Sequence, residues 1–139
     1  MASCAGPSKP TLSLSKNVES RVNTGDQFTL TVHDSEGATV GSPATTSGSA
    51  TGTQSAKVGP VDVTEGSTYT LQEAASGTTT LSDYAITAAC TMSGSPVATT
   101  GSNGTFAVTI PSDAKGLIDC VITNGPPKIE LKKNVAKRV

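Results

Sequence analysis

Three stretches of the chain each place one polar residue on a face that is otherwise apolar. The stretches, residues 10–18, 69–73 and 118–124, alternate apolar and polar residues with the period of a half-buried strand. The polar exceptions are Lys16, Glu73 and Asn124. A buried charge is costly unless it is paired or neutralised, so three exceptions in the same register predict that these side chains meet. An amine buried in this way has a lowered pKa, and in its neutral form it is a nucleophile.

The elements that must position these residues are short strands, separated by clusters of Gly, Ser, Asn, Asp and Pro. We predict an all-β fold, a β-sandwich of about seven strands. The predicted strands are residues 11–18, 27–34, 53–63, 68–73, 84–92, 105–110 and 117–124. Residues 35–52 are expected to form a polar loop, with a weak strand at 38–40, and residues 80–84 can form a single helical turn.

Composition limits the classes of function. The chain has 139 residues and a formal net charge of −1, which gives no electrostatic basis for binding nucleic acid or a membrane surface. No apolar run is long enough to span a bilayer, so we expect no membrane insertion in this segment. Aromatic residues make up 3% of the chain, so the core must depend on smaller aliphatic side chains and would gain from covalent cross-links.

Two of the three cysteines are predicted to face the core. Cys90 shares a face with Ile86 and Ala88, and Cys120 lies on the inward face of the last strand. They can form a disulfide in an oxidising compartment, or remain two buried thiols. Cys4 lies in the N-terminal tail, and the sequence assigns it no role.

The start of the chain recurs at its end. Residues 10–22 align without gaps to residues 127–139 at a constant offset of 117, so that Lys16 matches Lys133. This pattern predicts a tandem array of similar units. We expect a tail over residues 1–9, one domain over residues 10–125, and a linker with the first strand of the next repeat over residues 126–139.

A second interpretation gives the recurring strand, residues 128–135, a role in assembly. Through Ile129, Leu131 and Lys133 it would be exchanged with an identical subunit, or added to the open edge of that subunit's sheet, and so build a fibre. A third is that the chain simply extends a little past the domain.

The three polar residues also carry a resemblance to a known family. The motifs LSLSKNV, YTLQE and CVITNGP resemble the first-strand Lys, middle-strand Glu and last-strand Asn of Cna protein B-type domains. These are also described as prealbumin-like or SpaA-like domains of bacterial surface proteins, and the similarity covers nearly all of residues 11–124. The resemblance implies an Ig-like or prealbumin-like sandwich. Cys90 and Cys120 resemble the cysteine pair of a subgroup with long extracellular arrays.

In many members of that family the Lys and Asn form an intramolecular isopeptide bond with the help of the Glu. The resemblance therefore implies that Lys16 is the nucleophile, Asn124 the electrophile and Glu73 the catalyst. Burial supports these roles, since it favours a neutral amine and a protonated carboxyl. Two alternatives remain: a buried Lys–Glu ion pair beside a hydrogen-bonded Asn, or one of the three residues reaching solvent at a strand end.

Other candidate sites are weaker. The single histidine, His33, alternates with inward residues and is predicted to point outward, so a Ser-His-Asp triad is not expected. Zinc-ligand spacing is absent, and Asp34 and Glu36 fit a plain turn better than a calcium loop. Asn103 fits both a turn and an N-glycosylation acceptor. We expect no metal and no cofactor.

The predicted function is mechanical. The resemblance implies an extracellular location on a bacterial cell surface, as a repeat of a stalk, adhesin or pilus-like protein. Neighbouring repeats or identical subunits are the expected partners. Bond formation is a single-turnover step, so no enzyme is expected. An alternative is a module that binds a host protein or glycan through its polar loops, chiefly residues 35–52.

Overall fold

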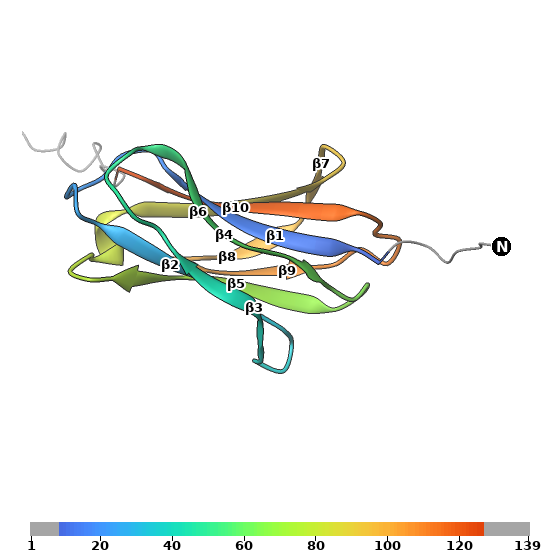
Figure 1. The fold of residues 1–139 in the computed structure, drawn as a ribbon. Helices are drawn as coiled ribbons and strands as arrows, with labels where there is room; N and C mark the ends of the chain where they lie inside the picture. Colours follow the sequence, from blue (N-terminus) through green and yellow to red (C-terminus); the bar gives the residue numbers. More distant parts are fainter. Residues whose placement is uncertain (1–8, 127–139) are drawn as a thin grey trace, which may run out of the picture.

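Residues 9–126 are described by a computed structural model, in which two five-stranded sheets lie face to face (Figure 1). The strands are β1 Thr11–Val18, β2 Gln27–His33, β3 Thr39–Thr45, β4 Gly52–Asp62, β5 Thr68–Ser76, β6 Ala85–Met92, β7 Ser95–Val97, β8 Thr99–Ser102, β9 Thr105–Thr109 and β10 Leu117–Gly125. A single 3₁₀ turn, η1 Leu81–Asp83, precedes β6. The prediction of an all-β sandwich is confirmed.

The first and last strands lie side by side. One sheet has the order β4-β1-β10-β6-β7 and the other has the order β3-β2-β5-β9-β8. The pair β1 and β10 is parallel, so both strands finish at the same end of the sandwich, and the chain enters the domain at the opposite end (Figure 1). We call the end at which β1 and β10 finish the exit end.

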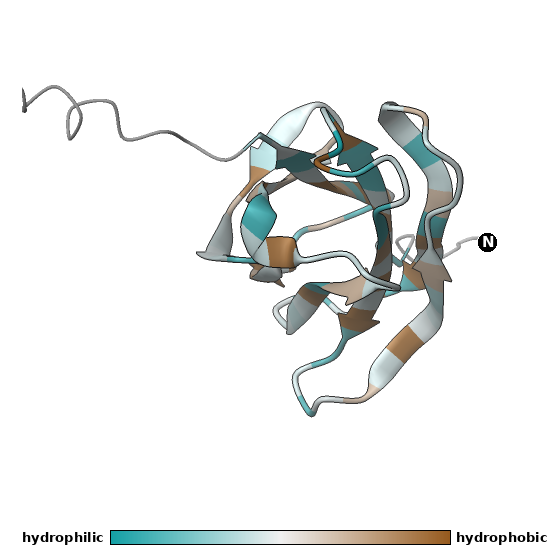
Figure 2. Cartoon of the chain, turned by 90° about the vertical axis from the view of Figure 1, so that its left-hand side faces the viewer, coloured by the Kyte–Doolittle hydropathy of each residue, from teal (hydrophilic) through white to brown (hydrophobic). Residues whose placement is uncertain are grey.

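The core lies between the sheets and is mainly aliphatic, as the composition requires. Inward residues such as Leu14, Leu71 and Ile122 are fully buried, and they alternate with more exposed residues along β5 and β10. Figure 2 looks at the exit end and shows apolar segments interspersed with polar ones along the same strands. The period of two thus fixes which side chains face the core.

All seven predicted strands are present within one to three residues at their ends, and three more strands occur in residues 9–126. The expected long loop over residues 35–52 is wrong, because the weak strand expected at 38–40 is part of a longer strand, β3 Thr39–Thr45, that pairs with β2. The short strands β7 and β8 were also missed. β3, β7 and β8 are edge strands built largely from Gly, Ser, Thr, Pro and Ala, and they depend on pairing with a neighbour rather than on their own pattern.

Candidate functional site

Two of the three polar residues come from the parallel pair of strands. In the register of β1 and β10, Lys16 lies opposite Ile122, and Val18 lies opposite Asn124. Residues two apart on a strand share a face, so the side chains of Lys16, Ile122 and Asn124 all enter the core. The long lysine side chain reaches past Ile122, its direct partner, to Asn124 two residues further along β10. Its Nζ donates a hydrogen bond of 2.6 Å to Asn124 Oδ1.

The third residue comes from the opposite sheet. Glu73 on β5 pairs with Leu30 of β2, and its Oε2 lies 3.3 Å from Lys16 Nζ. The amine also donates to the backbone carbonyls of Asn17, at 3.2 Å, and Ile122, at 3.3 Å. The structure therefore brings Lys16, Glu73 and Asn124 together in one site that joins the two sheets.

This site is closed to solvent. Lys16 and Asn124 are 0% exposed and Glu73 is 3% exposed. The ring of Phe28 lies beside the amine, with its centroid 4.8 Å from Nζ. Lys16 therefore does not reach solvent, and the three side chains are in contact rather than separated.

Burial moves the two titrating groups toward their neutral forms. Desolvation lowers the pKa of Lys16 from 10.5 to about 8; the charge of Glu73 opposes this shift, and that of Arg21 adds to it. Desolvation likewise raises the pKa of Glu73, against the opposing effect of Lys16. A neutral amine beside a protonated carboxyl is thus much more accessible here than in water.

Several polar atoms of the site have no hydrogen-bond partner within residues 9–126. They are both carboxyl oxygens of Glu73 and Nδ2 of Asn124. The ion-pair contact of Oε2 with Lys16 is close, but it lacks hydrogen-bond geometry. Buried polar groups are normally hydrogen-bonded, and leaving one unpaired costs about 1–3 kcal/mol. The buried ion pair of Lys16 and Glu73 beside Asn124 is therefore an energetically unfavourable arrangement.

The geometry suits acyl transfer from an amide to an amine. Because Nζ touches Oδ1 of Asn124, it also lies next to the amide carbon, Cγ, which is the atom that a nucleophile attacks. Glu73 lies beside the amine, where a carboxyl group can take up and return a proton.

A disulfide joins β10, the strand that carries Asn124, to β6. Cys90 of β6 and Cys120 of β10 are bonded and lie directly opposite each other in the register. Cys120 faces the core, as does Asn124 four residues later. The inward orientation of both cysteines was predicted, and the disulfide, rather than a pair of free thiols, is what the structure contains.

The other candidates have ordinary local roles. His33 Nε2 contacts Gln72 Oε1 at 3.1 Å, away from the lysine site. The carboxylate of Asp34 accepts hydrogen bonds from the backbone nitrogens of Glu36 and Ala38, which describes a turn. Asn103, with a φ of 57°, precedes Gly104 in the turn between β8 and β9. Cys4, Ile129, Leu131 and Lys133 lie outside the described residues.

Phe28 was missed as part of the site. A signal existed: Phe28 and Leu30 share the inward face of β2, and Leu30 pairs with Glu73. The alternation alone gives Phe28 an inward position, whereas its place near the glutamate follows from the pairing of β2 with β5 in the structure.

Two further observations concern the part of the chain that the structure describes. It contains no group of three or more His, Cys, Asp or Glu side chains arranged to hold a metal ion. None of its helical segments has the length and hydropathy needed to cross a membrane.

The family described as "Prealbumin-like fold domain" matches residues 11–126. Among solved structures, a bacterial adhesin from Mobiluncus mulieris, described as containing intramolecular disulfide, isopeptide and ester bond cross-links, is similar in two crystal forms. The first has a TM-score of 0.55 and 18% identity, and the second 0.56 and 16%. Each comparison covers 89% of this chain and 43% of the adhesin.

A major pilin protein, T-13 of Streptococcus pyogenes, has a TM-score of 0.44 and 16% identity, over 86% of this chain and 46% of the pilin. The chain thus spans less than half of each of these solved proteins. No curated protein matches the sequence. Identities this low show a shared fold only.

Proposed function

The chain belongs to the family of prealbumin-like fold domains, and on this basis we propose that it is a structural repeat of a bacterial cell-surface stalk, adhesin or pilus-like protein. In this proposal an isopeptide bond between Lys16 and Asn124 locks the domain, and Glu73 catalyses its formation. The disulfide between Cys90 and Cys120 adds a second cross-link. Neighbouring repeats follow with a period of 117 residues and are the partners of this unit.

The observation that carries the proposal is the buried contact between Lys16 Nζ and Asn124 Oδ1 beside a carboxyl group. A permanent ion pair in this position would leave Oε1 of Glu73 and Nδ2 of Asn124 without a hydrogen-bond partner in the core. Support of a different kind comes from the Mobiluncus mulieris adhesin, whose description names both an isopeptide and a disulfide cross-link.

The proposed reaction balances without a co-reactant. The neutral amine of Lys16 attacks Cγ of Asn124, while the protonated Glu73 donates to the carbonyl oxygen as negative charge develops there. Glu73 then takes a proton from the former amine and delivers it to Nδ2. The bond between Cγ and Nδ2 breaks and ammonia leaves. The carbonyl oxygen returns its proton to Glu73, and Lys16 and Asn124 share a neutral secondary amide.

The bond would suit a mechanical role because of its place in the topology. It joins the first strand to the last at the exit end, so tension between the two ends would run along β1, through the bond, and out after β10. The residues between the bonded side chains would carry none of this load. The domain would therefore act as a short, inextensible element in a longer chain.

The role of Glu73 is tested by the variant Glu73→Gln, which keeps the shape of the side chain but cannot shuttle a proton. We expect its intact mass under denaturing conditions to keep the ammonia that the parent chain loses. Glu65→Gln is a matched control, because Glu65 lies in the turn before β5 and is exposed, and it should lose ammonia as the parent does. A bond between Lys16 and Asn124 that forms in Glu73→Gln as in the parent, shown by the branched tryptic peptide, would refute the catalytic role.

A further inference from the structure

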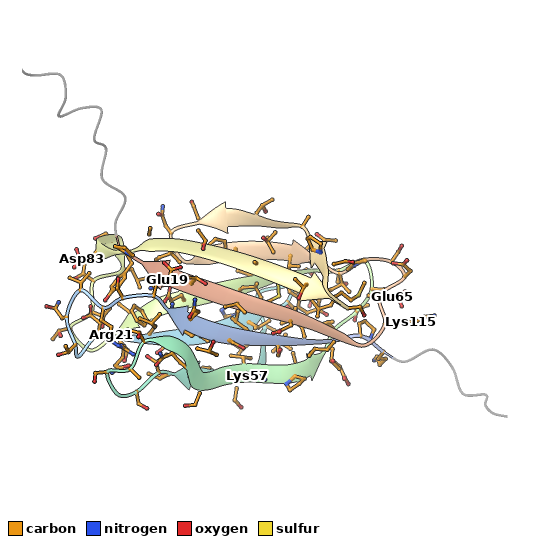
Figure 3. All side chains as sticks on the ribbon, turned by 90° about the horizontal axis from the view of Figure 1, so that it is seen from above. Glu19, Arg21, Lys57, Glu65, Asp83 and Lys115 are labelled. Carbon is orange, nitrogen blue, oxygen red and sulfur yellow. A yellow bond between two sulfur atoms is a disulfide. The ribbon has the colours of Figure 1, made fainter. Side chains whose placement is uncertain are left out.

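The site is covered at the exit end by the segment that links the two sheets. This crossover segment, residues 19–26, leads from the end of β1 to the start of β2 in the opposite sheet. Figure 3 shows Glu19, Arg21 and Asp83 at this end of the sandwich, and Glu65 and Lys115 at the other. The segment starts directly against the site, because the backbone nitrogen of Glu19 donates to the backbone carbonyl of Asn124 at 2.8 Å.

Tyr84, directly before β6, holds the crossover segment in place. Its hydroxyl donates to Oδ2 of Asp26 and accepts a hydrogen bond of 2.8 Å from the backbone nitrogen of Val22. The same oxygen of Asp26 accepts from the backbone nitrogen of Asn23 at 3.2 Å. Asp26 is 2% exposed, so this network is internal and gives a short polar loop a fixed shape.

The ring of Tyr84 connects this network to the lysine. It packs edge-on against Phe28, with the ring centroids 5.3 Å apart and the planes at 83°. Phe28 in turn lies against Lys16 Nζ. Val18, Phe28 and Tyr84 form a small buried cluster, separate from the main core, at the exit end.

We propose that Tyr84 is a positioning residue for the cross-link: its hydroxyl fastens the crossover segment, and its ring holds Phe28 over Lys16, so that water is kept from the amine while the bond forms. This inference rests on the proposed function. Sequence reasoning did not single out Tyr84, because its ring and its hydroxyl act on residues far away in the chain.

The electrostatic consequence depends on the charges that face the amine. β5 contributes Glu73 and the crossover segment contributes Arg21, while Asp26 is bonded to the Tyr84 hydroxyl. β10 presents only uncharged groups, the Asn124 amide and the Ile122 carbonyl. The titration that matters is therefore that of the coupled pair Lys16 and Glu73.

In the reactive form of this pair, the carboxyl group of Glu73 is protonated and the amine of Lys16 is neutral. If water enters, the pKa of Lys16 rises toward its ordinary value and that of Glu73 falls toward its own. The proton then moves from the carboxyl to the amine, and each unit of rise in the Lys16 pKa lowers the reactive fraction about tenfold. The pH range over which the pair holds a single proton becomes wider at the same time.

The experiment follows, by mass spectrometry of tryptic digests, the formation of the branched peptide that joins Lys16 to Asn124 in the freshly synthesised chain between pH 5 and pH 10. Tyr84→Phe removes only the hydroxyl. We expect the maximum of its pH–rate profile to be about tenfold lower than that of the parent. The alkaline limb of the profile, where the rate falls as the pH rises, should move up by about one pH unit, as a rise of one unit in the Lys16 pKa requires. Tyr69→Phe is the matched control: its hydroxyl accepts from the backbone nitrogen of Thr64 at 2.8 Å and it is also buried. This control should leave rate and limbs unchanged.

The outcomes separate this inference from the proposed function. A parent chain that never loses ammonia would remove the proposed function and this inference with it. A parent that reacts, with Tyr84→Phe reacting at the same rate and with the same limbs, would overturn the inference alone. So would a slower rate with unmoved limbs, since that is the result of a smaller folded fraction. If Tyr84→Phe does not fold, Asp26→Ala, which keeps the ring and removes the acceptor, should show the same shift, and unmoved limbs there would overturn the inference.

Discussion

The proposed cross-link makes a quantitative prediction for a domain that is stretched between its ends. Lys16 and Asn124 are 108 residues apart in sequence and in contact in the fold. If the bond is present, the chain between them is shielded from force. If the bond is removed, unfolding releases this chain at about 3.6 Å per residue, or roughly 390 Å in total.

The disulfide divides this length into two parts. It closes a loop of 30 residues that lies wholly within the shielded segment. Without the isopeptide bond but with the disulfide intact, 78 residues remain free to extend, the difference between 108 and 30. The expected release is then roughly 280 Å, and reduction of the disulfide should add about 110 Å.

Single-molecule force spectroscopy on the parent chain and on Lys16→Met measures these lengths. Methionine is chosen because it has a length similar to that of lysine and keeps the core filled, while it lacks the amine. The parent should show none of these releases, with or without reductant. A release of roughly 280 Å in the oxidised parent, or no release in Lys16→Met, would refute the reasoning.

Three further predictions concern stability. Lys16→Met should lower the free energy of unfolding by about 4–5 kcal/mol, because the lost bond closed a loop of about 108 residues; equal urea midpoints in variant and parent would contradict this. The double variant Cys90→Ala, Cys120→Ala should lose about 3–4 kcal/mol for its loop of 30 residues, again measured in urea. Asn124→Ala cannot form the bond, so Lys16 remains an amine with a lowered pKa of about 8. Between pH 8 and 10.5, the unfolded state of this variant therefore binds more protons than the folded state. Its stability should therefore rise with pH across this window, whereas the cross-linked parent should show no such rise from Lys16; equal pH profiles in the two proteins would count against burial of a titrating amine.

The site was more predictable from the sequence than parts of the fold. A strand has a period of two, so the apolar neighbours Leu14, Leu71 and Ile122 fix the faces of Lys16, Glu73 and Asn124. The cost of burying unpaired charge then implies that the three meet. Neither step requires knowledge of which strands pair.

The remainder depended on contacts between distant segments. β3, β7 and β8 are short edge strands with little apolar patterning of their own, and pairing with β2, β6 and β9 defines them. The ring contacts that link Lys16 through Phe28 to Tyr84 join residues from β1, β2 and the turn before β6. The spacing of these residues in the sequence does not predict such contacts, because the residues are far apart along the chain.

Peptide mapping of the oxidised and then reduced parent chain tests the central claim most directly. Loss of ammonia alone is insufficient, since Asn124 precedes Gly125, and an Asn-Gly step can also lose ammonia by cyclising to a succinimide. Trypsin cleaves after Arg21, Lys115 and Lys128, and the bond would block cleavage after Lys16. We predict one branched peptide that joins the segment ending at Arg21 to residues 116–128, lighter than the two parts by one ammonia. Complete cleavage after Lys16, with residues 116–128 recovered as a linear peptide, would contradict the account.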